Sequence, residues 1–288
     1  MNTKNIIITG ATSGIGLAAA QALAGMGAYS IIGIARDQEK SQKAQDTILQ
    51  LYPDAKVTYL LADLASQKQV RLLAKEIQKT LTQQGDGHID VLINNAGTVS
   101  NWYTATEDGY ELQFAVNHLA PFLLTHELLP LLQAAPAARV LTVSSGSHRN
   151  MRIHWKDVMY RKNYNTLLAY KQSKLANVLF SYEFNRRYGN GSGPRAFAID
   201  PGLVNTRIGL KGTSGLVRWI WDRRRQGGSS PEKGAETVVH IATDPSVSDT
   251  KEVYWKDRQP LSPSKYAQRA FEASRLWALS EQLCGIKK

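Results

Sequence analysis

A glycine-rich turn lies near the start of the chain, between an apolar run and a helix-forming stretch. Residues 6–8 are all isoleucine and predict a short buried strand, and residues 17–26 are rich in alanine and predict a helix. The turn between them reads Thr9-Gly10-Ala11-Thr12-Ser13-Gly14-Ile15-Gly16. A diphosphate could bind the unpaired N–H groups and the positive dipole end of such a helix. The order of strand, turn and helix therefore predicts a dinucleotide site.

The spacing of these glycines leaves an alternative open. It is Gly-x-x-x-Gly-x-Gly rather than the usual Gly-x-Gly-x-x-Gly of dinucleotide sites. A tight structural turn without a ligand could use the same residues. If a dinucleotide binds, Gly10 and Gly14 supply positive φ or close approach to the ligand, and Gly16 lets the helix pack closely on the sheet.

Further along the chain, segments with strand-like and helix-like patterns alternate. Strands after the first are predicted over residues 29–35, 56–61, 90–93, 139–143, 195–199 and 252–255. Helices are predicted over about 37–51, 66–84, 107–132, 166–187, 231–243 and 264–283. Right-handed crossovers turn such a series into a parallel sheet with helices on both faces. We predict an α/β, doubly wound Rossmann fold of about seven strands, and a single domain over residues 1–288 because no repeat or linker marks a boundary.

The composition is that of an ordinary soluble globular protein, with 43% hydrophobic residues, 20% charged residues and a mean hydropathy of −0.31. A lone cysteine, Cys284, excludes an internal disulfide and a cysteine-based metal site, and it fits a reducing compartment. We expect a cytoplasmic protein, because no signal peptide precedes the first strand and no apolar run approaches the roughly 20 residues of a membrane span.

The formal net charge of +11 would attract anions, among them nucleotides, acidic lipids and nucleic acids. No nucleic-acid-binding motif accompanies the basic run Arg223-Arg224-Arg225, so we expect no nucleic-acid partner. A weak contact with a membrane surface stays open and would make the protein peripheral to membranes. We also expect no metal site, because His148 and His154 share a loop without further ligands at metal spacing.

Polar residues near the ends of the predicted strands carry the candidate chemistry. Ser144 and Ser145 follow one strand, and Tyr170 and Lys174 are four apart on one predicted helix, which puts them on the same face. A free tyrosine has a pKa of about 10, and an adjacent ammonium lowers it, which suits proton exchange with a carbonyl oxygen. A serine hydroxyl could donate to the same oxygen. Each motif alone also occurs in ordinary turns and exposed helices, so only the whole set indicates hydride transfer to a carbonyl.

Taken together, these motifs resemble the short-chain dehydrogenase/reductase family over nearly the whole chain. The matching residues are Thr9-Gly-x-x-x-Gly-x-Gly16, Asp63, Asn94-Asn-Ala-Gly97, Asn117, Ser145, Tyr170-x-x-x-Lys174, Pro201-Gly202 and Thr206. The chain is most similar to the retinol-dehydrogenase-like group, in the stretches Ala35-Arg36-Asp37, Val116-Asn117-His118-Leu119, Ser173-Lys174-Leu175-Ala176-Asn177-Val178-Leu179-Phe180 and Leu276-Trp277-x-x-Ser280. The resemblance implies an NAD(P)-dependent oxidoreductase that acts on CH–OH and C=O groups.

By resemblance, the catalytic residues are Asn117, Ser145, Tyr170 and Lys174. Tyr170 exchanges the proton, Ser145 donates to the substrate oxygen, and Asn117 holds a water that links the lysine to solvent. The gap between Ser145 and Tyr170 is longer than the family's usual gap, and the extra residues fall in the loop 146–163. An insertion there is shared by the retinol-dehydrogenase-like members. Ser144 competes with Ser145, and the family pattern favours the second serine.

The choice of cofactor depends on the end of the second strand. An acid there would bond the ribose 2′-hydroxyl of NAD, whereas an arginine accommodates the 2′-phosphate of NADP. Arg36 occupies this place, so we predict a preference for NADP(H). NAD(H) stays possible if Arg36 is only solvated and Asp37 binds the hydroxyl.

The resemblance also assigns a set of cofactor-binding residues. They are Gly10, Thr12, Ser13, Gly14, Ile15, Gly16, Arg36, Asp63, Leu64, Asn94, Ala96, Gly97, Tyr170, Lys174, Pro201, Gly202, Val204 and Thr206. Asp63 would approach the adenine ring, and a helix-capping role for it is nearly as good an interpretation.

A segment at about 205–230 lies where this family places its substrate lid. Leu216, Trp219 and Ile220 fall there at helical spacing and predict one apolar face. The segment could cover an apolar substrate, contact a membrane or pack as an ordinary surface helix. We favour the lid, and with it a small-molecule carbonyl or alcohol substrate, namely a lipophilic aldehyde or ketone that is retinal-like or similar. The alternative hypothesis is a catalytically silent NADP(H)-binding regulatory protein. Either a monomer or a homodimer fits the sequence.

Overall fold

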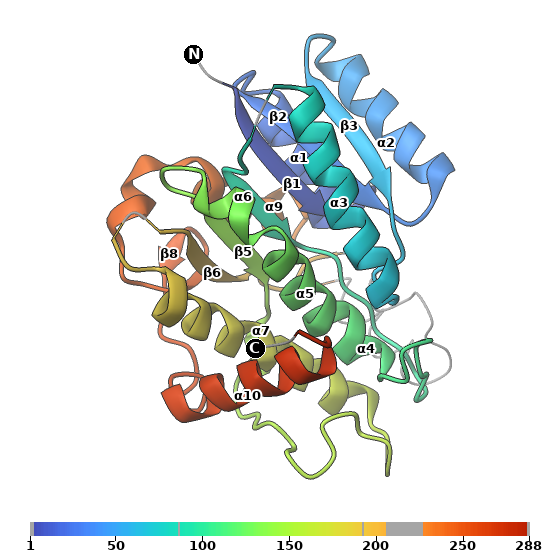
Figure 1. Cartoon of the computed structure of the whole chain (residues 1–288), viewed down its shortest axis with the longest axis vertical. Helices are drawn as coiled ribbons and strands as arrows, with labels where there is room; N and C mark the ends of the chain where they lie inside the picture. Colours follow the sequence, from blue (N-terminus) through green and yellow to red (C-terminus); the bar gives the residue numbers. More distant parts are fainter. Residues whose placement is uncertain (1–2, 86, 192, 206–226, 287–288) are drawn as a thin grey trace.

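One eight-stranded sheet forms the centre of the molecule (Figure 1). The computed structural model describes residues 3–85, 87–191, 193–205 and 227–286. The strands are β1 Lys4–Thr9, β2 Tyr29–Ala35, β3 Lys56–Leu61, β4 Val91–Asn94, β5 Arg139–Val143, β6 Arg195–Asp200, β7 Tyr254–Lys256 and β8 Gln259–Pro260. Their order across the sheet is β3-β2-β1-β4-β5-β6-β7-β8, and all neighbours from β3 to β7 pair in parallel. The predicted doubly wound α/β fold is confirmed.

The sheet contains a short eighth strand that the sequence does not predict. β8 runs antiparallel to β7, with Trp255 opposite Pro260. The two strands are joined by Asp257 and Arg258, whose φ angles are 49° and 60°. Two consecutive positive φ angles are typical of a type I′ hairpin, which usually has glycine at its second position. Because arginine stands there, the sequence carries no clear hairpin signal.

Helices cover both faces of the sheet (Figure 1). They are α1 Gly14–Ala24, α2 Gln38–Leu51, α3 Gln67–Gln83, α4 Leu112–Phe114, α5 Ala120–Glu127, α6 Leu129–Gln133, α7 Thr166–Tyr188, α9 Pro231–Thr243 and α10 Ala270–Leu283. Successive β1 side chains enter opposite cores: Ile7 belongs to the core that includes side chains of α3, α5, α7 and α10, while Ile6 and Ile8 belong to the core that includes side chains of α1, α2 and α9. The strand order reverses between β1 and β4, so ligands are expected at the carboxyl ends of these strands.

The helix predicted over residues 107–132 is wrong in its start and in its continuity. The chain first makes a turn in which Gly109 has a φ of 78°, and α4 begins only after that turn. The helical path then widens into a π-helical turn over Ala115–Leu119. It breaks at Leu128, because Pro130 has no N–H to continue the hydrogen-bond ladder and instead opens α6.

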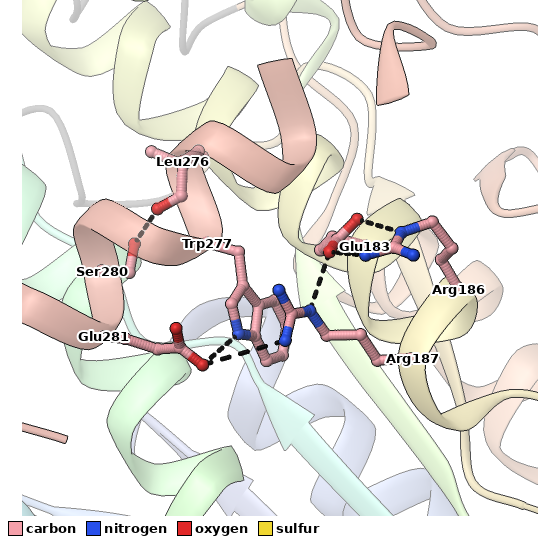
Figure 2. Close-up of polar contacts among 7 residues, drawn as sticks. All are labelled: Glu183, Arg186, Arg187, Leu276, Trp277, Ser280 and Glu281. Atoms are coloured by element: carbon pink, nitrogen blue, oxygen red, sulfur yellow. Dashed lines mark hydrogen bonds and ion pairs between the residues drawn. The ribbon is translucent and has the colours of Figure 1, made fainter. Parts of the chain in front are cut away.

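Helix α10 packs along α7, and Figure 2 shows Arg187 of α7 beside Trp277 and Glu281 of α10. The Trp277 ring is parallel to that of Phe180, with 5.8 Å between centroids, and its indole N–H donates to Glu281 at 2.7 Å. The guanidinium of Arg187 lies 4.7 Å from the centroid of Trp277 and also donates to the buried Glu183 at 2.7 Å. The cation of Arg187 over the Trp277 ring therefore joins the two helices, and the buried Glu183, on α7 itself, holds that cation in place.

Helix α10 begins at Ala270, later than predicted, because residues 265–268 form turns. Just before these turns, the Ser264 N–H donates to the ring of His148 at 3.1 Å. At the other end of α10, Arg71 of α3 donates to the carbonyl oxygen of the buried Cys284 at 2.5 Å. The helix is thus fixed to both halves of the chain.

Candidate active site

The glycine turn after β1 has the positive φ angles that its sequence allows. They are 69° at Gly10 and 57° at Gly14. Gly16 is crowded by the turn rather than by the sheet, which differs from our prediction. A Cβ at Gly16 would lie 2.3 Å from the Gly10 carbonyl oxygen and 2.5 Å from the side-chain nitrogen of Asn95. Any larger residue would therefore push the turn away from the loop after β4.

The first turn of α1 offers partners for an anion. Within the described residues, the N-cap Ser13 makes no side-chain capping bond, and the first turn of α1 carries no acidic residue. The first N–H groups of a helix have no partner inside the helix and carry its positive dipole end. Thr12 and Ile15 lie half-buried beside this end. The group of residues therefore fits the diphosphate of a dinucleotide.

The loop after β4 is hydrogen-bonded to the glycine turn. The hydroxyl of Thr9 accepts the N–H groups of Asn95 and Ala96, both at 3.0 Å, and the Asn95 side chain donates to the Thr9 carbonyl at 2.9 Å. Asn95 belongs to the predicted Asn94-Asn-Ala-Gly97 motif, but the sequence reasoning did not include it among the cofactor-site residues. The predicted Asn94 points elsewhere, because its amide donates to Thr125 of α5 at 3.1 Å. Gly97 is half-buried at the same sheet edge.

A tyrosine from β3 also holds the turn. The hydroxyl of Tyr59 donates to the Ala11 carbonyl at 2.9 Å, and burial raises the pKa of Tyr59 to about 12, so the hydroxyl stays a donor. Its ring lies over Gly33 of β2, where a Cβ would be 2.5 Å from a ring carbon. Glycine inside a strand marks such a close approach, so Gly33 is the signal that could have predicted this contact.

Two neighbouring charged residues follow β2, and they are used differently. Asp37 caps α2: its carboxylate accepts the Lys40 N–H at 3.0 Å and pairs with the Lys40 ammonium at 2.5 Å. These bonds hold the pKa of Asp37 below its usual range. Arg36 is exposed one residue earlier. Arg36 is therefore exposed to solvent at the end of β2, whereas the carboxylate of Asp37 is already bonded as the N-cap of α2.

At the end of β3, Asp63 and Leu64 lie half-buried at the same edge of the sheet. The Asp63 carboxylate accepts the Ala65 N–H at 3.0 Å. The cap of α3 is Ser66, whose hydroxyl accepts the Gln69 N–H at 3.3 Å. The alternative role of Asp63 as a helix cap is therefore wrong.

The predicted tyrosine and lysine of α7 share one face of the helix. Lys174 is only 3% exposed, and its ammonium donates to the Val143 carbonyl at the end of β5, at 2.9 Å. The ammonium nitrogen lies 5.6 Å from the centroid of the Tyr170 ring. Burial lowers the pKa of Lys174 to about 8. A buried ammonium beside a phenol is the arrangement that favours the phenolate.

The two serines after β5 have different surroundings. Ser144 is buried, and its hydroxyl donates to the Lys174 carbonyl at 2.8 Å, so it fastens α7 to the sheet. Ser145 is half-buried, and its hydroxyl contacts the N–H and the hydroxyl of Ser147, both at 3.1 Å. This arrangement favours Ser145 as the serine that can turn toward a substrate.

Asn117 lies in the π-helical turn and is fully buried. Its side-chain oxygen accepts the Thr98 N–H at 2.7 Å, and its amide donates to the Thr98 carbonyl at 3.1 Å and to Ser173 at 3.0 Å. The side chain thus joins the loop after β4 to α7, beside Lys174. A water relay through Asn117 stays a prediction and would have to use its backbone.

The loop after β6 completes the sheet edge. Gly202 has a φ of 75°, and its N–H donates to the buried Asp200 at 3.0 Å, with Pro201 between them. Asp200 therefore shapes the predicted Pro-Gly turn.

Two predicted cofactor residues that are far apart in the sequence, Ile15 and Val204, meet at Gly234 of α9. A Cβ at Gly234 would lie 2.6 Å from Val204 and 3.2 Å from Ile15, so glycine lets all three segments approach. Residues 206–226 lie outside the described residues, and they include the predicted cofactor residue Thr206 and most of the predicted lid. In the part of the chain that is described, no group of three His, Cys, Asp or Glu side chains is arranged to hold a metal ion.

The family model for short chain dehydrogenases matches residues 4–214. The chain belongs to the short-chain dehydrogenase family. It is 35% identical to retinol dehydrogenase 14 of Mus musculus, over 100% of this chain and 88% of that protein. It is 36% identical to retinol dehydrogenase 13 of Homo sapiens, over 99% of this chain and 85% of that protein.

Solved structures agree with this assignment. An uncharacterized protein from Mycobacterium Paratuberculosis is similar with a TM-score of 0.75 and 34% identity, over 99% of this chain and 94% of that one. An NADPH-bound carbonyl reductase from chicken fatty liver has a TM-score of 0.67 and 20% identity, over 91% of this chain and 100% of that one, and supports the fold alone.

As a short-chain dehydrogenase, the protein is an NAD(P)-dependent oxidoreductase that acts on small-molecule carbonyl or alcohol groups.

Proposed function

We propose that this short-chain dehydrogenase transfers hydride between NADP(H) and a lipophilic aldehyde or ketone, or the corresponding alcohol. The observation that carries the proposal is the grouping of Tyr170, buried Lys174 and half-buried Ser145 at the carboxyl end of β5. When bound, the nicotinamide supplies or accepts the hydride. The protein's residues have to handle the accompanying proton.

Tyr170 is the proposed proton donor to the carbonyl oxygen in reduction, and the acceptor from the alcohol in oxidation. The hydroxyl of Ser145 would donate to the same oxygen and stabilise the negative charge that develops on it. The ammonium of Lys174, which lies beside the Tyr170 ring, favours the phenolate. Because the pKa of Lys174 is about 8, this support should weaken at higher pH.

The preference for NADP(H) over NAD(H) rests on the end of β2. The exposed Arg36 can pair with a 2′-phosphate. The carboxylate of Asp37, which would otherwise accept the ribose hydroxyl of NAD, is bonded to Lys40 as the cap of α2.

The lipophilic substrate class rests on two exposed apolar side chains in segments that adjoin the site. Leu203 is 47% exposed just after Gly202. Trp102 is 73% exposed, in a loop whose Asn101 carbonyl accepts the hydroxyl of α7's first residue at 3.0 Å. The names of the retinol dehydrogenase relatives support the same class.

Other parts of the proposal concern location and assembly. A cytoplasmic protein with a weak membrane contact stays a prediction, as do the single domain, the lid over 205–230 and the choice between monomer and homodimer. Within the described ranges, every helix is too short or too polar to span a bilayer.

A panel of paired carbonyls tests the proposed function. Each pair should share the reacting group and differ in a long or ring-bearing apolar part, and oxidation of NADPH and NADH is followed by absorbance. We expect turnover with NADPH and a higher kcat/KM for the larger member of each pair. Tight NADPH binding without turnover of any carbonyl or alcohol would favour the silent regulatory protein instead.

A further inference from the structure

His148 lies directly behind the proposed catalytic serine. It ends the 3-10 turn Gly146–His148, and its side chain is fully buried. Its ring Nδ1 lies 2.8 Å from the Ser145 carbonyl oxygen, and its own backbone N–H donates to the same oxygen at 3.1 Å. One residue therefore holds the backbone of Ser145 through two bonds.

The partners of the His148 ring define its protonation state. The backbone N–H of Ser264 donates to Nε2 at 3.1 Å, so Nε2 carries no hydrogen. The carbonyl of Ser145 can only accept, so Nδ1 must carry the hydrogen. Only the neutral Nδ1–H tautomer satisfies both partners, because an imidazolium would direct a second N–H at that of Ser264.

The His148 ring is linked through Tyr254 and Asp200 to Gly202, one of the predicted cofactor-binding residues. The His148 ring lies 4.9 Å from that of Tyr254, whose hydroxyl donates to Asp200 at 2.8 Å. The other oxygen of Asp200 accepts the Gly202 N–H. Burial, the largest cause, lowers the pKa of His148; the charge of Arg149 acts in the same direction, and that of Asp200 acts against it.

We propose that His148 is a positioning residue that fixes Ser145 for catalysis. It does so by donating from Nδ1 to the serine's carbonyl, while Ser264 holds the far side of the ring. His148 touches no reacting atom itself. The inference rests on the proposed function, because it gives Ser145 the role of donor to the substrate oxygen.

Two substitutions separate the two bonds of the ring. In His148→Asn, the side-chain N–H₂ can replace Nδ1–H as donor to Ser145, but nothing reaches Ser264. In His148→Gln, the longer side chain can place its oxygen near Ser264, but it has no donor at the Nδ1 position. We expect His148→Gln to lower kcat about tenfold, since small displacements in a site are costly. KM for NADPH should stay within about twofold, and His148→Asn should recover a large part of kcat.

His154→Gln is the matched control, because its ring also bonds a backbone carbonyl, that of Asp157 at 3.0 Å, but on the exposed part of the same loop. Its kcat should be that of the wild type. In a Ser145→Ala background, His148→Gln should cause no further loss of kcat, because the serine it positions is gone. Equal losses in His148→Asn and His148→Gln, or an additive loss in the Ser145→Ala background, would overturn the proposal.

A measurement on the wild-type protein keeps the inference testable if a variant fails to fold. Nitrogen chemical shifts of the His148 ring at neutral pH should show the Nδ1–H tautomer, and the Nε2–H tautomer or an imidazolium would refute the assigned bonds.

The kinetics of the variants also separate the positioning role of His148 from the proposed function of the site. If Ser145→Ala retains full activity, the proposed function of the site is wrong. If Ser145→Ala loses activity but His148→Asn and His148→Gln lose kcat equally, only the positioning role of His148 is wrong.

Discussion

The glycine turn after β1 and the catalytic face of α7 differ in whether their polar groups are already bonded within the protein. The turn is fixed by neutral bonds from its neighbours, such as those of Tyr59 and Asn95, while the first N–H groups of α1 and the exposed Arg36 remain for a ligand. On α7, by contrast, Lys174 is buried and already bonded to the sheet.

The difference follows from what each region has to do. A site for a charged ligand binds best with preformed donors that are not occupied by the protein itself. A proton-transfer site has to change the proton affinity of a side chain, which requires burial and a nearby charge. Substitutions in the two regions should therefore have separable effects, on binding for the turn and on turnover for α7.

The largest effect should come from Tyr170→Phe. Loss of the phenolic hydroxyl removes the proposed proton donor, so kcat should fall by about two decades or more. Binding of NADPH, measured by titration, should be unchanged, because the ring remains. Tyr182→Phe, on the same helix and half-buried, is the control and should keep normal turnover. Near-normal turnover in Tyr170→Phe would rule out the mechanism.

Arg36→Ala should have the next largest effect, and only on binding. Loss of a charge-assisted bond to the 2′-phosphate should raise the Kd for NADPH by about ten- to a hundredfold. The Kd for NADH should hardly change, because NADH lacks that phosphate. Lys43→Ala, an exposed cation on α2, controls for general charge. If both cofactors lose affinity equally, the arginine has a structural role.

Lys174→Met tests the cost of burying the ammonium. The lysine's pKa is about 8 in the fold and 10.5 in the unfolded chain, so between these values the unfolded chain binds more protons. The free energy of unfolding of the wild type should therefore rise with pH relative to the variant, by about 1–2 kcal/mol from pH 8 to 9.5. Urea titrations at each pH measure this difference. Parallel curves for the two proteins would mean that the ammonium carries no burial penalty.

The smallest effect should come from Tyr59→Phe at the glycine turn. Removing one hydroxyl leaves the Ala11 carbonyl without this donor and should lower the free energy of unfolding by about 1 kcal/mol. A modest weakening of NADPH binding should accompany it, with kcat unchanged. Tyr52→Phe is the control, since that side chain is 37% exposed. A fall in kcat rather than in binding would break the distinction between the two regions.

The sequence predicts the features that depend on neighbouring residues. Strands from apolar runs, the turn from Gly10 and Gly14, and the shared face of Tyr170 and Lys174 are all local patterns, and the structure contains them. The family resemblance supplied the rest of the predicted site, which local patterns alone do not define.

The features that were missed depend on segments far apart in the chain. Asn95 matters because Thr9 of another strand accepts its N–H, and the role of His148 depends on Ser264. The helix predicted over 107–132 is wrong for a different reason. Its apolar periodicity continues through Leu128, but Pro130 lacks the N–H that would continue the helix, so a new helix begins there. The bonds of Asn95 and His148 join loops that are far apart in the chain, and no local pattern of residues predicts them.

The docking of α10 has a consequence for how the molecule assembles. Its end bonds to Arg71 of α3, and its Trp277 packs on Phe180 of α7, so it depends on two elements that are distant in sequence (Figure 2 shows the α7 side). Contacts of such long sequence separation require large loops to close first, and they form slowly. We therefore expect the covering of α7 by α10 to be a late kinetic step, after the parallel sheet has brought α3 and α7 to the same face.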